Sequence, residues 1–433
     1  MAADSSPRSR SSDTQSPAFY PPKQLPLMAR LVQSISYPLA HVLYKVRIFV
    51  SEEFVGAVRS IDDARIVFVC NHPTMEDGIA LFVLSARLGQ LFHYVVAYEA
   101  FGGLMGWFIQ HLGCYSIRRG LGDRASISQT LSMLKQPRCR LVIFPEGGCS
   151  YQNDTIMSFR PGAIQLPMSA LAQLAKKADS PAQIPDLYVV PLSLKYQYQQ
   201  PMQRVIEALL SRLEDRLNLE ASSLDSYQRL RRVGNQVILR IEQEADLSGT
   251  EDLDWNERIE RLRKIFIEKC ESALDIEPNL NAPIRERVYR VQAELEDLEA
   301  ATESVSEKVV KGATVKKTAK GEKTPSKGAH RLNPQKIYWD TVRLLNFDAI
   351  YDGYVAEAPT QERFLDTLTR IEREVFHLEH AQPKAPRKAR FYVGTPINLK
   401  QYLTDYQDDR SGTVERLAVH LHDVMQANLE KLI

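Results

Sequence analysis

The chain has 433 residues, of which 44% are hydrophobic and 25% are charged, so it can bury the core of one large domain or of two to three ordinary ones. Its formal net charge of +1 gives no support for a nucleic-acid-binding protein. The five cysteines, Cys70, Cys114, Cys139, Cys149 and Cys270, form no CxxC pair, which argues for a reducing compartment and against a disulfide framework or a zinc ribbon.

The N-terminal part divides into two segments of different composition. Residues 1–24 are rich in Ser, Pro and Gln, which predicts disorder. Residues 25–50 space apolar side chains mostly three or four positions apart, which predicts an amphipathic helix, or a pair of helices broken near Pro38. This segment could pack on the main core or lie on a membrane surface. Because no apolar run is long enough to span a membrane and no secretory signal is present, we expect a cytoplasmic protein, peripheral at a membrane.

Residues 60–198 alternate between strand-like and helix-like segments. Short apolar segments typical of buried strands occur at 66–70, 92–98, 112–117, 140–144 and 187–194. Segments with helical character lie at 73–88, 102–111, 122–135 and 162–178. This alternation predicts an α/β fold with a mixed, largely parallel sheet flanked by helices, and it places a ligand site beyond the carboxyl ends of the strands.

The C-terminal half has a different character. Residues 200–300, 334–346 and 361–379 have the spacing of amphipathic helices. Between them, residues 306–332 are rich in Lys, Ala, Thr and Gly and are predicted to be a flexible basic linker. A strand ended by a turn is expected at 389–397, and a closing helix at about 413–431.

The first stretch with chemical potential follows the strand at 66–70. His72 lies at the junction between this strand and a predicted helix that ends at Gly89. Pro73 suits the first turn of that helix. Asp77 lies about one turn into the helix, where its carboxylate can orient the imidazole for proton transfer. The alternative interpretation is a helix-capping histidine with an acidic residue in the first turn.

Two further strand ends carry polar residues. The strand before Gly120 ends in Arg118 and Arg119, and because adjacent side chains point to opposite sides, one guanidinium can face a phosphate; a solvated strand end is the alternative. The strand at 140–144 continues into Pro-Glu-Gly-Gly. The backbone at Glu146 and Gly147 could therefore approach a ligand closely; a polar turn without a ligand is the alternative.

Two other segments complete the set. Arg160 precedes the helix that begins near residue 162, and its guanidinium with the free N–H groups of that helix makes a candidate anion site. Pro191 stands inside the strand at 187–194, which predicts an edge strand or a bulge that shapes an apolar wall; ordinary core packing is the alternative.

Taken in order, these stretches resemble the four motifs of the glycerolipid acyltransferase family, of the lysophosphatidate acyltransferase type. The matching elements are His72 with Asp77, Gly113 to Arg119, Phe144-Pro145-Glu146-Gly147, and Val190-Pro191. The resemblance covers about residues 60–196, and Phe391–Ile397 resembles the family's last strand. It implies that residues 199–388 are a large helical insertion before that strand and that residues 389–433 complete the acyltransferase domain.

The resemblance also implies the roles of the site residues. His72 would be the general base that takes the proton of an acceptor hydroxyl, and Asp77 would orient its ring. The acceptor, a lysophospholipid or glycerol phosphate at the cytoplasmic membrane face, would attack an acyl-CoA or acyl-carrier-protein thioester directly, with no cofactor and no metal. Arg119 would bind the acceptor phosphate, while Glu146 and Gly147 would shape the acceptor site.

One departure concerns the residues after Phe-Pro-Glu-Gly. The family often has Thr-Arg-Ser there, whereas this chain has Gly148, Cys149 and Ser150, so the cation is missing and Arg118 or Arg160 could replace it. This departure and the long helical segment support a second hypothesis, a non-catalytic lipid-binding or scaffold protein on an acyltransferase fold. A serine hydrolase is not supported, because the chain has no Gly-x-Ser-x-Gly elbow.

Overall fold

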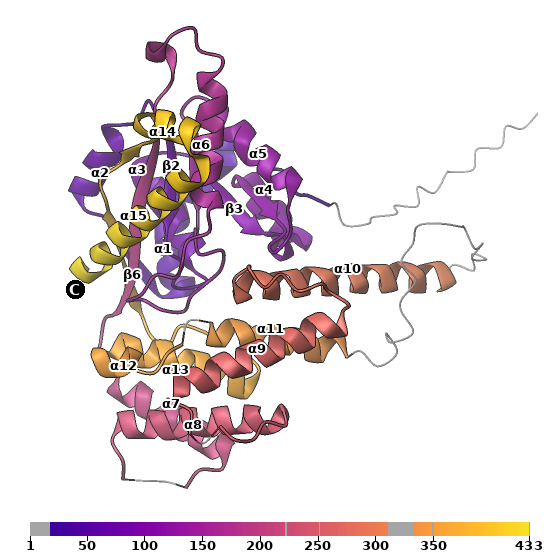
Figure 1. The fold of residues 1–433 in the computed structure, drawn as a ribbon. Coiled ribbons are helices and arrows are strands. Elements are labelled where there is room, and N and C mark those ends of the chain that lie inside the picture. Colours follow the sequence, from indigo (N-terminus) through magenta and orange to yellow (C-terminus); the bar gives the residue numbers. More distant parts are fainter. Residues whose placement is uncertain (1–17, 221–222, 251, 311–332, 349, 433) are drawn as a thin grey trace, which may run out of the picture.

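The computed structural model describes residues 18–220, 223–250, 252–310, 333–348 and 350–432 (Figure 1). The helices are α1 Pro26–Tyr44, α2 Glu52–Arg59, α3 Asp77–Leu88, α4 Gly103–His111, α5 Arg124–Lys135, α6 Gly162–Ala175, α7 Gln203–Leu217, α8 Ser226–Glu244, α9 Trp255–Ala273, α10 Ile284–Val310, α11 Pro334–Phe347, α12 Tyr354–Glu357, α13 Gln361–Phe376, α14 Leu403–Asp408 and α15 Arg410–Lys431. The strands are β1 Val46–Phe49, β2 Arg65–Cys70, β3 His93–Ala97, β4 Cys114–Ile117, β5 Arg140–Ile143, β6 Leu187–Tyr198, β7 Arg387–Val393 and β8 Ile397–Asn398. Short 3₁₀ helices lie at η1 Tyr98–Phe101, η2 Pro181–Gln183 and η4 Leu399–Tyr402.

The strands of the described residues form one eight-stranded sheet. Its order is β1-β7-β6-β2-β5-β3-β4, and β8 pairs with β6 beyond the end of β7. Strands β6, β2, β5, β3 and β4 run parallel, whereas β7 is antiparallel to β6 and carries β1 parallel to itself. The predicted mixed, largely parallel α/β sheet is therefore confirmed, and helices α7–α13 are inserted between β6 and β7.

Both faces of the sheet are covered because side chains alternate along each buried strand. In β2, Ile66 and Phe68 belong to the core that the sheet forms with α2 and α3. Val67 and Val69 belong to the opposite core, formed with α5, α6 and α15. Since both faces are filled with apolar side chains, polar residues that follow the strands emerge at the carboxyl edge of the sheet, where His72 and Glu146 lie.

The inserted helices have a separate hydrophobic core. Leu210 of α7, Val233 of α8, Ile267 of α9 and Leu368 of α13 are fully buried within it. Figure 1 shows these helices as a layered body beyond the C-terminal end of β6, with α10 on the side that faces the sheet. The insertion therefore packs as its own unit while α10 reaches the acyltransferase-like part.

Two of the N-terminal predictions need correction, and one alternative left open there is decided. Residues 1–17 lie outside the described residues, but Tyr20 is ordered and exchanges hydrogen bonds with Ser116 at the end of β4. Helix α1 continues through Pro38 as a single helix. Residues 46–49 are a strand rather than helix, because β1 pairs with β7, a partner more than 300 positions away that local periodicity cannot reveal.

Other boundaries also differ from the prediction. Helix α3 begins at Asp77, so Pro73 lies in the loop before the helix and Asp77 in its first turn. Strand β6 has neighbours on both sides, so the edge position expected from Pro191 is wrong. The Pro191 carbonyl accepts the Gly394 N–H at 2.9 Å. The N–H that proline lacks would point to this same side of β6, where the chain turns between β7 and β8. No ladder hydrogen bond from residue 191 is therefore lost there. Of the predicted linker at 306–332, residues 306–310 belong to α10 and 311–332 lie outside the described residues.

Candidate active site

An imidazole and a carboxylate meet at the carboxyl end of β2. His72 Nδ1 lies 2.7 Å from Asp77 Oδ2. The Asp77 side chain is fully buried, whereas the His72 side chain is 18% exposed. Because an ionised carboxylate can only accept, His72 donates from Nδ1–H, which leaves the Nε2 lone pair free to take a proton.

The buried carboxylate of Asp77 is held from four directions. Besides the His72 bond, Oδ2 accepts the Thr74 backbone N–H at 3.0 Å. Its other oxygen, Oδ1, accepts the hydroxyls of Thr74 at 2.9 Å and of Tyr196 at 2.8 Å. Such a set of donors fixes the position of the carboxylate. The imidazole is fixed too, since its ring stacks on Phe144 with centroids 4.2 Å apart.

The turn after β5 is tied to the histidine. Glu146 accepts the His72 backbone N–H on Oε1 at 2.7 Å and the Met157 N–H on Oε2 at 3.1 Å. Burial raises the pKa of this carboxyl, although the two backbone N–H groups oppose the shift. Gly147 has φ +73°, a conformation that favours glycine, and a Cβ there would overlap the Arg160 guanidinium. Glu146 therefore supports the backbone of His72, and Arg160 lies against the turn.

The arginines expected to bind phosphate have different surroundings. Arg118 and Arg119 point to different partners, as alternation at a strand end requires. Arg118 pairs with Asp297 at 2.5 Å, and Arg119 pairs with Glu99 at 3.0 Å. Among the described residues, the Arg160 guanidinium has no hydrogen-bond or ion-pair partner. Of the two proposed replacements for a cation at position 149, Arg160 is the one that approaches the turn.

Side chains of the insertion contact the same turn from the opposite side. Arg285 of α10 donates from Nη1 to the Gly148 carbonyl at 3.0 Å and pairs through Nε with Asp348 at 2.6 Å. Arg370 of α13 donates to the Ser150 carbonyl. The turn that follows β5 is thus enclosed by the sheet on one side and by α10 and α13 on the other.

A cleft, partly open to solvent, lies beside the loop that holds the dyad. Residues 73–76 line one side, and Thr369, Lys384 and Arg387 contribute from the insertion and the start of β7. Arg387 pairs with Glu76 at 3.3 Å and stacks over the Tyr196 ring. The loop between His72 and Asp77 therefore borders a cleft that both parts of the protein line, although neither of these two side chains lines it.

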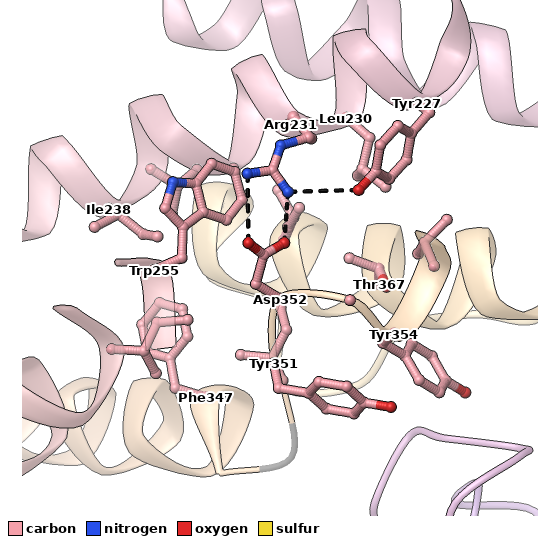
Figure 2. Close-up of a pocket in the computed structure, with 17 residues that line it drawn as sticks. Tyr227, Leu230, Arg231, Ile238, Trp255, Phe347, Tyr351, Asp352, Tyr354 and Thr367 are labelled. Carbon is pink, nitrogen blue, oxygen red and sulfur yellow. Dashed lines mark hydrogen bonds and ion pairs between the residues drawn. The ribbon is translucent and has the colours of Figure 1, made fainter. Parts of the chain in front are cut away.

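Another cavity, partly open to solvent, lies within the insertion (Figure 2). Figure 2 shows aromatic and aliphatic side chains around the ion pair of Arg231 and Asp352, with Trp255 beside the guanidinium. Tyr354 lines this cavity and donates its hydroxyl to Asp366. None of the predicted site residues lines it.

The described part of the chain contains neither a metal-binding cluster nor a membrane-spanning helix. There, no group of three or more His, Cys, Asp and Glu side chains is arranged to hold a metal ion. Likewise, no helix in that part of the chain combines the length and the apolar character needed to cross a bilayer. Cys149 lies in the turn after β5, and burial raises the pKa of its thiol, which disfavours a nucleophilic thiolate.

Five of the six predicted site residues form one continuous cluster: His72, Asp77, Glu146, Gly147 and Arg160. Arg119 is connected to this cluster through the Tyr289 ring, on which both it and Arg160 stack. No sequence pattern indicated Tyr196 or Tyr289, which come from β6 and from the insertion. Thr74 lies between the two dyad residues, so its role could have been suspected from spacing alone.

Residues 51–195 match the protein-family model described as Acyltransferase. The matched stretch starts before the predicted boundary at residue 60, contains all six predicted site residues, and ends within β6, where the insertion begins. No curated protein shows a significant match to the chain.

Proposed function

Because residues 51–195 match the family model described as Acyltransferase and their motifs resemble those of the glycerolipid acyltransferase family, we propose that the protein moves a fatty acyl group from a thioester donor to a lipid hydroxyl. The donor is acyl-CoA or acyl-carrier protein, and the acceptor is a lysophospholipid or glycerol phosphate. The observation that carries this proposal is the 2.7 Å contact between His72 Nδ1 and a buried Asp77 that four donors hold in place.

In the proposed mechanism, His72 Nε2 takes the proton of the acceptor hydroxyl as its oxygen attacks the thioester carbonyl. The C–O bond forms, the C–S bond breaks, and the thiol leaves with a proton. Asp77 stabilises the imidazolium that exists between the two proton transfers. Phe144 limits rotation of the ring, so the base stays aimed while the two substrates meet.

The test compares His72→Ala with wild type in an assay of acyl-CoA consumption and lysophosphatidate acylation. A positioned general base typically contributes a factor of about 10²–10⁴, so we expect a loss of that size. His420→Ala is the matched control, because His420 is exposed on α15 and distant in sequence from the site. Unchanged turnover in His72→Ala would end the assignment of the base. Failure of wild type to consume any acyl donor would favour the lipid-binding or scaffold alternative.

We also propose that the protein acts at the cytoplasmic face of a membrane, with α1 as its contact. Helix α1 packs on the protein through small and polar residues, namely Ala29, Gln33, Ser36 and Ala40. Its large apolar side chains point outward, with Leu27 88% and Leu31 68% exposed. An apolar face of this kind is suited to the interface of a lipid bilayer.

Flotation with anionic vesicles tests the membrane proposal. We expect wild type to float at low salt and the double variant Leu27→Glu/Leu31→Glu to remain at the bottom, because two charges cannot enter the apolar interface without a large cost. Val419→Glu places a charge on another exposed apolar residue, on α15, and should float like wild type. Wild-type protein that stays wholly at the bottom excludes this proposal.

A further inference from the structure

Helix α10 packs directly on both turns that carry the predicted acceptor-binding residues. Its backbone at Tyr289 and Arg290 lies so close to Gly120 that a Cβ at this position would overlap it. The Tyr289 hydroxyl takes the space that a side chain would need at Gly148. One helix of the insertion therefore contacts the turn after β4 and the turn after β5 at once, and glycine makes both contacts possible.

Two arginines of the acyltransferase domain stack on a single ring of α10. The Cζ atom of Arg119 lies 4.2 Å from the Tyr289 ring centroid, and that of Arg160 lies 5.6 Å from it. Stacking engages the face of a guanidinium and leaves N–H groups on its edge free to bind an oxyanion. Tyr289 thus restrains both cations without using their hydrogen-bonding groups.

The surrounding charges indicate what these cations are arranged to bind. Arg285 lies beside the same turn, so three guanidinium groups gather around one tyrosine. Burial lowers the pKa of Arg160, and the charges of Arg285 and Arg119 add to this effect, while Glu286 opposes it. Glu99 already pairs with Arg119 and Asp348 with Arg285, whereas Arg160 has no ion-pair partner among the described residues, so an oxyanion such as phosphate would supply the missing counter-charge beside Arg160.

We propose that α10 completes a binding site for a phosphate monoester, in which Tyr289 is a positioning residue that holds Arg119 and Arg160 toward the anion. The identification of this group as the acceptor's phosphate rests on the proposed function; the anion site itself does not. A phosphate monoester could also come from the 3′-phosphate of coenzyme A, so the experiment separates the two sources.

The first experiment measures the binding of inorganic phosphate to the full-length protein by isothermal titration calorimetry. Tyr289→Leu removes the ring and should weaken binding about tenfold, whereas Tyr289→Phe keeps the ring and should remain within about threefold of wild type. The matched control is Tyr227→Leu, because Tyr227 also stacks on an arginine, Arg231, but within the insertion. Equal affinity in wild type and Tyr289→Leu, or no phosphate binding to wild type, overturns the proposal.

A second experiment assigns the source of the phosphate from steady-state kinetics. We expect Tyr289→Leu to raise the KM for lysophosphatidate about tenfold with little change in kcat, and to leave the KM for acyl-CoA unchanged. Monoacylglycerol, which lacks the phosphate, should show no such effect. A raised KM for acyl-CoA that disappears with a donor lacking the 3′-phosphate overturns the assignment to the acceptor. If wild type shows phosphate binding that depends on Tyr289 but no turnover, the enzymatic proposal fails and the anion site stands.

A double variant tests the contact between α10 and the turn. In Gly148→Ala the new methyl group meets the Tyr289 hydroxyl, so phosphate binding should weaken. Adding Tyr289→Phe removes that hydroxyl and should restore part of the lost affinity, as expected for two residues in direct contact. Thermal unfolding midpoints show that each variant is folded. If the double variant binds no better than Gly148→Ala, the proposed contact is wrong.

Discussion

Replacing Asp77 by Asn separates two contributions of this carboxylate, because the structure indicates how an amide would fit. Oδ2 accepts from two nitrogens, His72 Nδ1 and Thr74 N, while Oδ1 accepts from two hydroxyls, those of Thr74 and Tyr196. Hydroxyls can rotate and accept, but the Thr74 N–H cannot. The amide oxygen should therefore occupy the Oδ2 position and its NH₂ group the Oδ1 position. His72 then keeps its Nδ1–H and its orientation, and only the negative charge is lost.

The lost charge sets the size of the effect. Hydrogen bonds to charged groups contribute about 1.5–3 kcal/mol net, against about 0.5–1.5 kcal/mol for neutral ones, a difference of about 1–1.5 kcal/mol. Coulomb's law for two unit charges about 4 Å apart at an effective dielectric constant of about 20 gives about 4 kcal/mol as the upper value. We therefore expect kcat/KM of Asp77→Asn to fall by a factor between about 10 and 10³. Asp77→Ala, which removes the orienting acceptor as well, should fall further.

The assay is the initial rate of acyl-CoA consumption with lysophosphatidate, with unfolding midpoints measured to show that each variant is folded. A rate for Asp77→Asn within about threefold of wild type would refute a role for the charge. A folded Asp77→Asn as inactive as His72→Ala would show that the ring adopts the other tautomer, and would refute the argument from the four donors.

Three further predictions follow from individual contacts. Tyr196→Phe removes the 2.8 Å donation to Asp77 Oδ1 and should lower kcat about tenfold in steady-state assays while leaving the acceptor KM near its wild-type value; an unchanged kcat contradicts it. Gly147→Ala must adopt φ near +73° and displace Arg160, so urea denaturation should show a loss of at least about 1–2 kcal/mol, and equal stability would show that the turn adapts. Burial and the neighbouring Glu99 raise the pKa of Glu296 to about 7. Between about pH 4.5 and 7, Glu296 therefore holds a proton in the folded protein that it has lost in the unfolded chain. The free energy of unfolding should fall as pH rises through that range. The stability of Glu296→Gln in urea titrations should be close to that of wild type near pH 5. At pH 8 the variant should be the more stable of the two. A wild-type protein that is the more stable one at pH 8 would contradict the assignment.

Much of the architecture could be predicted because local patterns carried it. The apolar β-branched segment before His72 and the segment before Pro145 became buried strands β2 and β5, since a strand covered on both faces must be apolar at nearly every position. The polar residues after them lie at the carboxyl edge because parallel strands end there together. Misplaced elements have long-range causes: β1 exists through its pairing with β7, and Pro191 is tolerated because the chain turns beside it.

The sequence by itself determined the α/β order of strands and helices and the five-residue spacing of His72 and Asp77, which brings these side chains within reach of each other in the loop between β2 and α3. Only the tertiary structure decided what holds these two side chains in place. The Tyr196 hydroxyl from β6 donates to the carboxylate, and the Phe144 ring after β5 stacks on the imidazole. It also decided that the insertion reaches the site, through a tyrosine of α10 between two arginines. Contacts between residues more than 70 positions apart depend on how layers pack, and a linear pattern of side chains does not encode which surfaces meet.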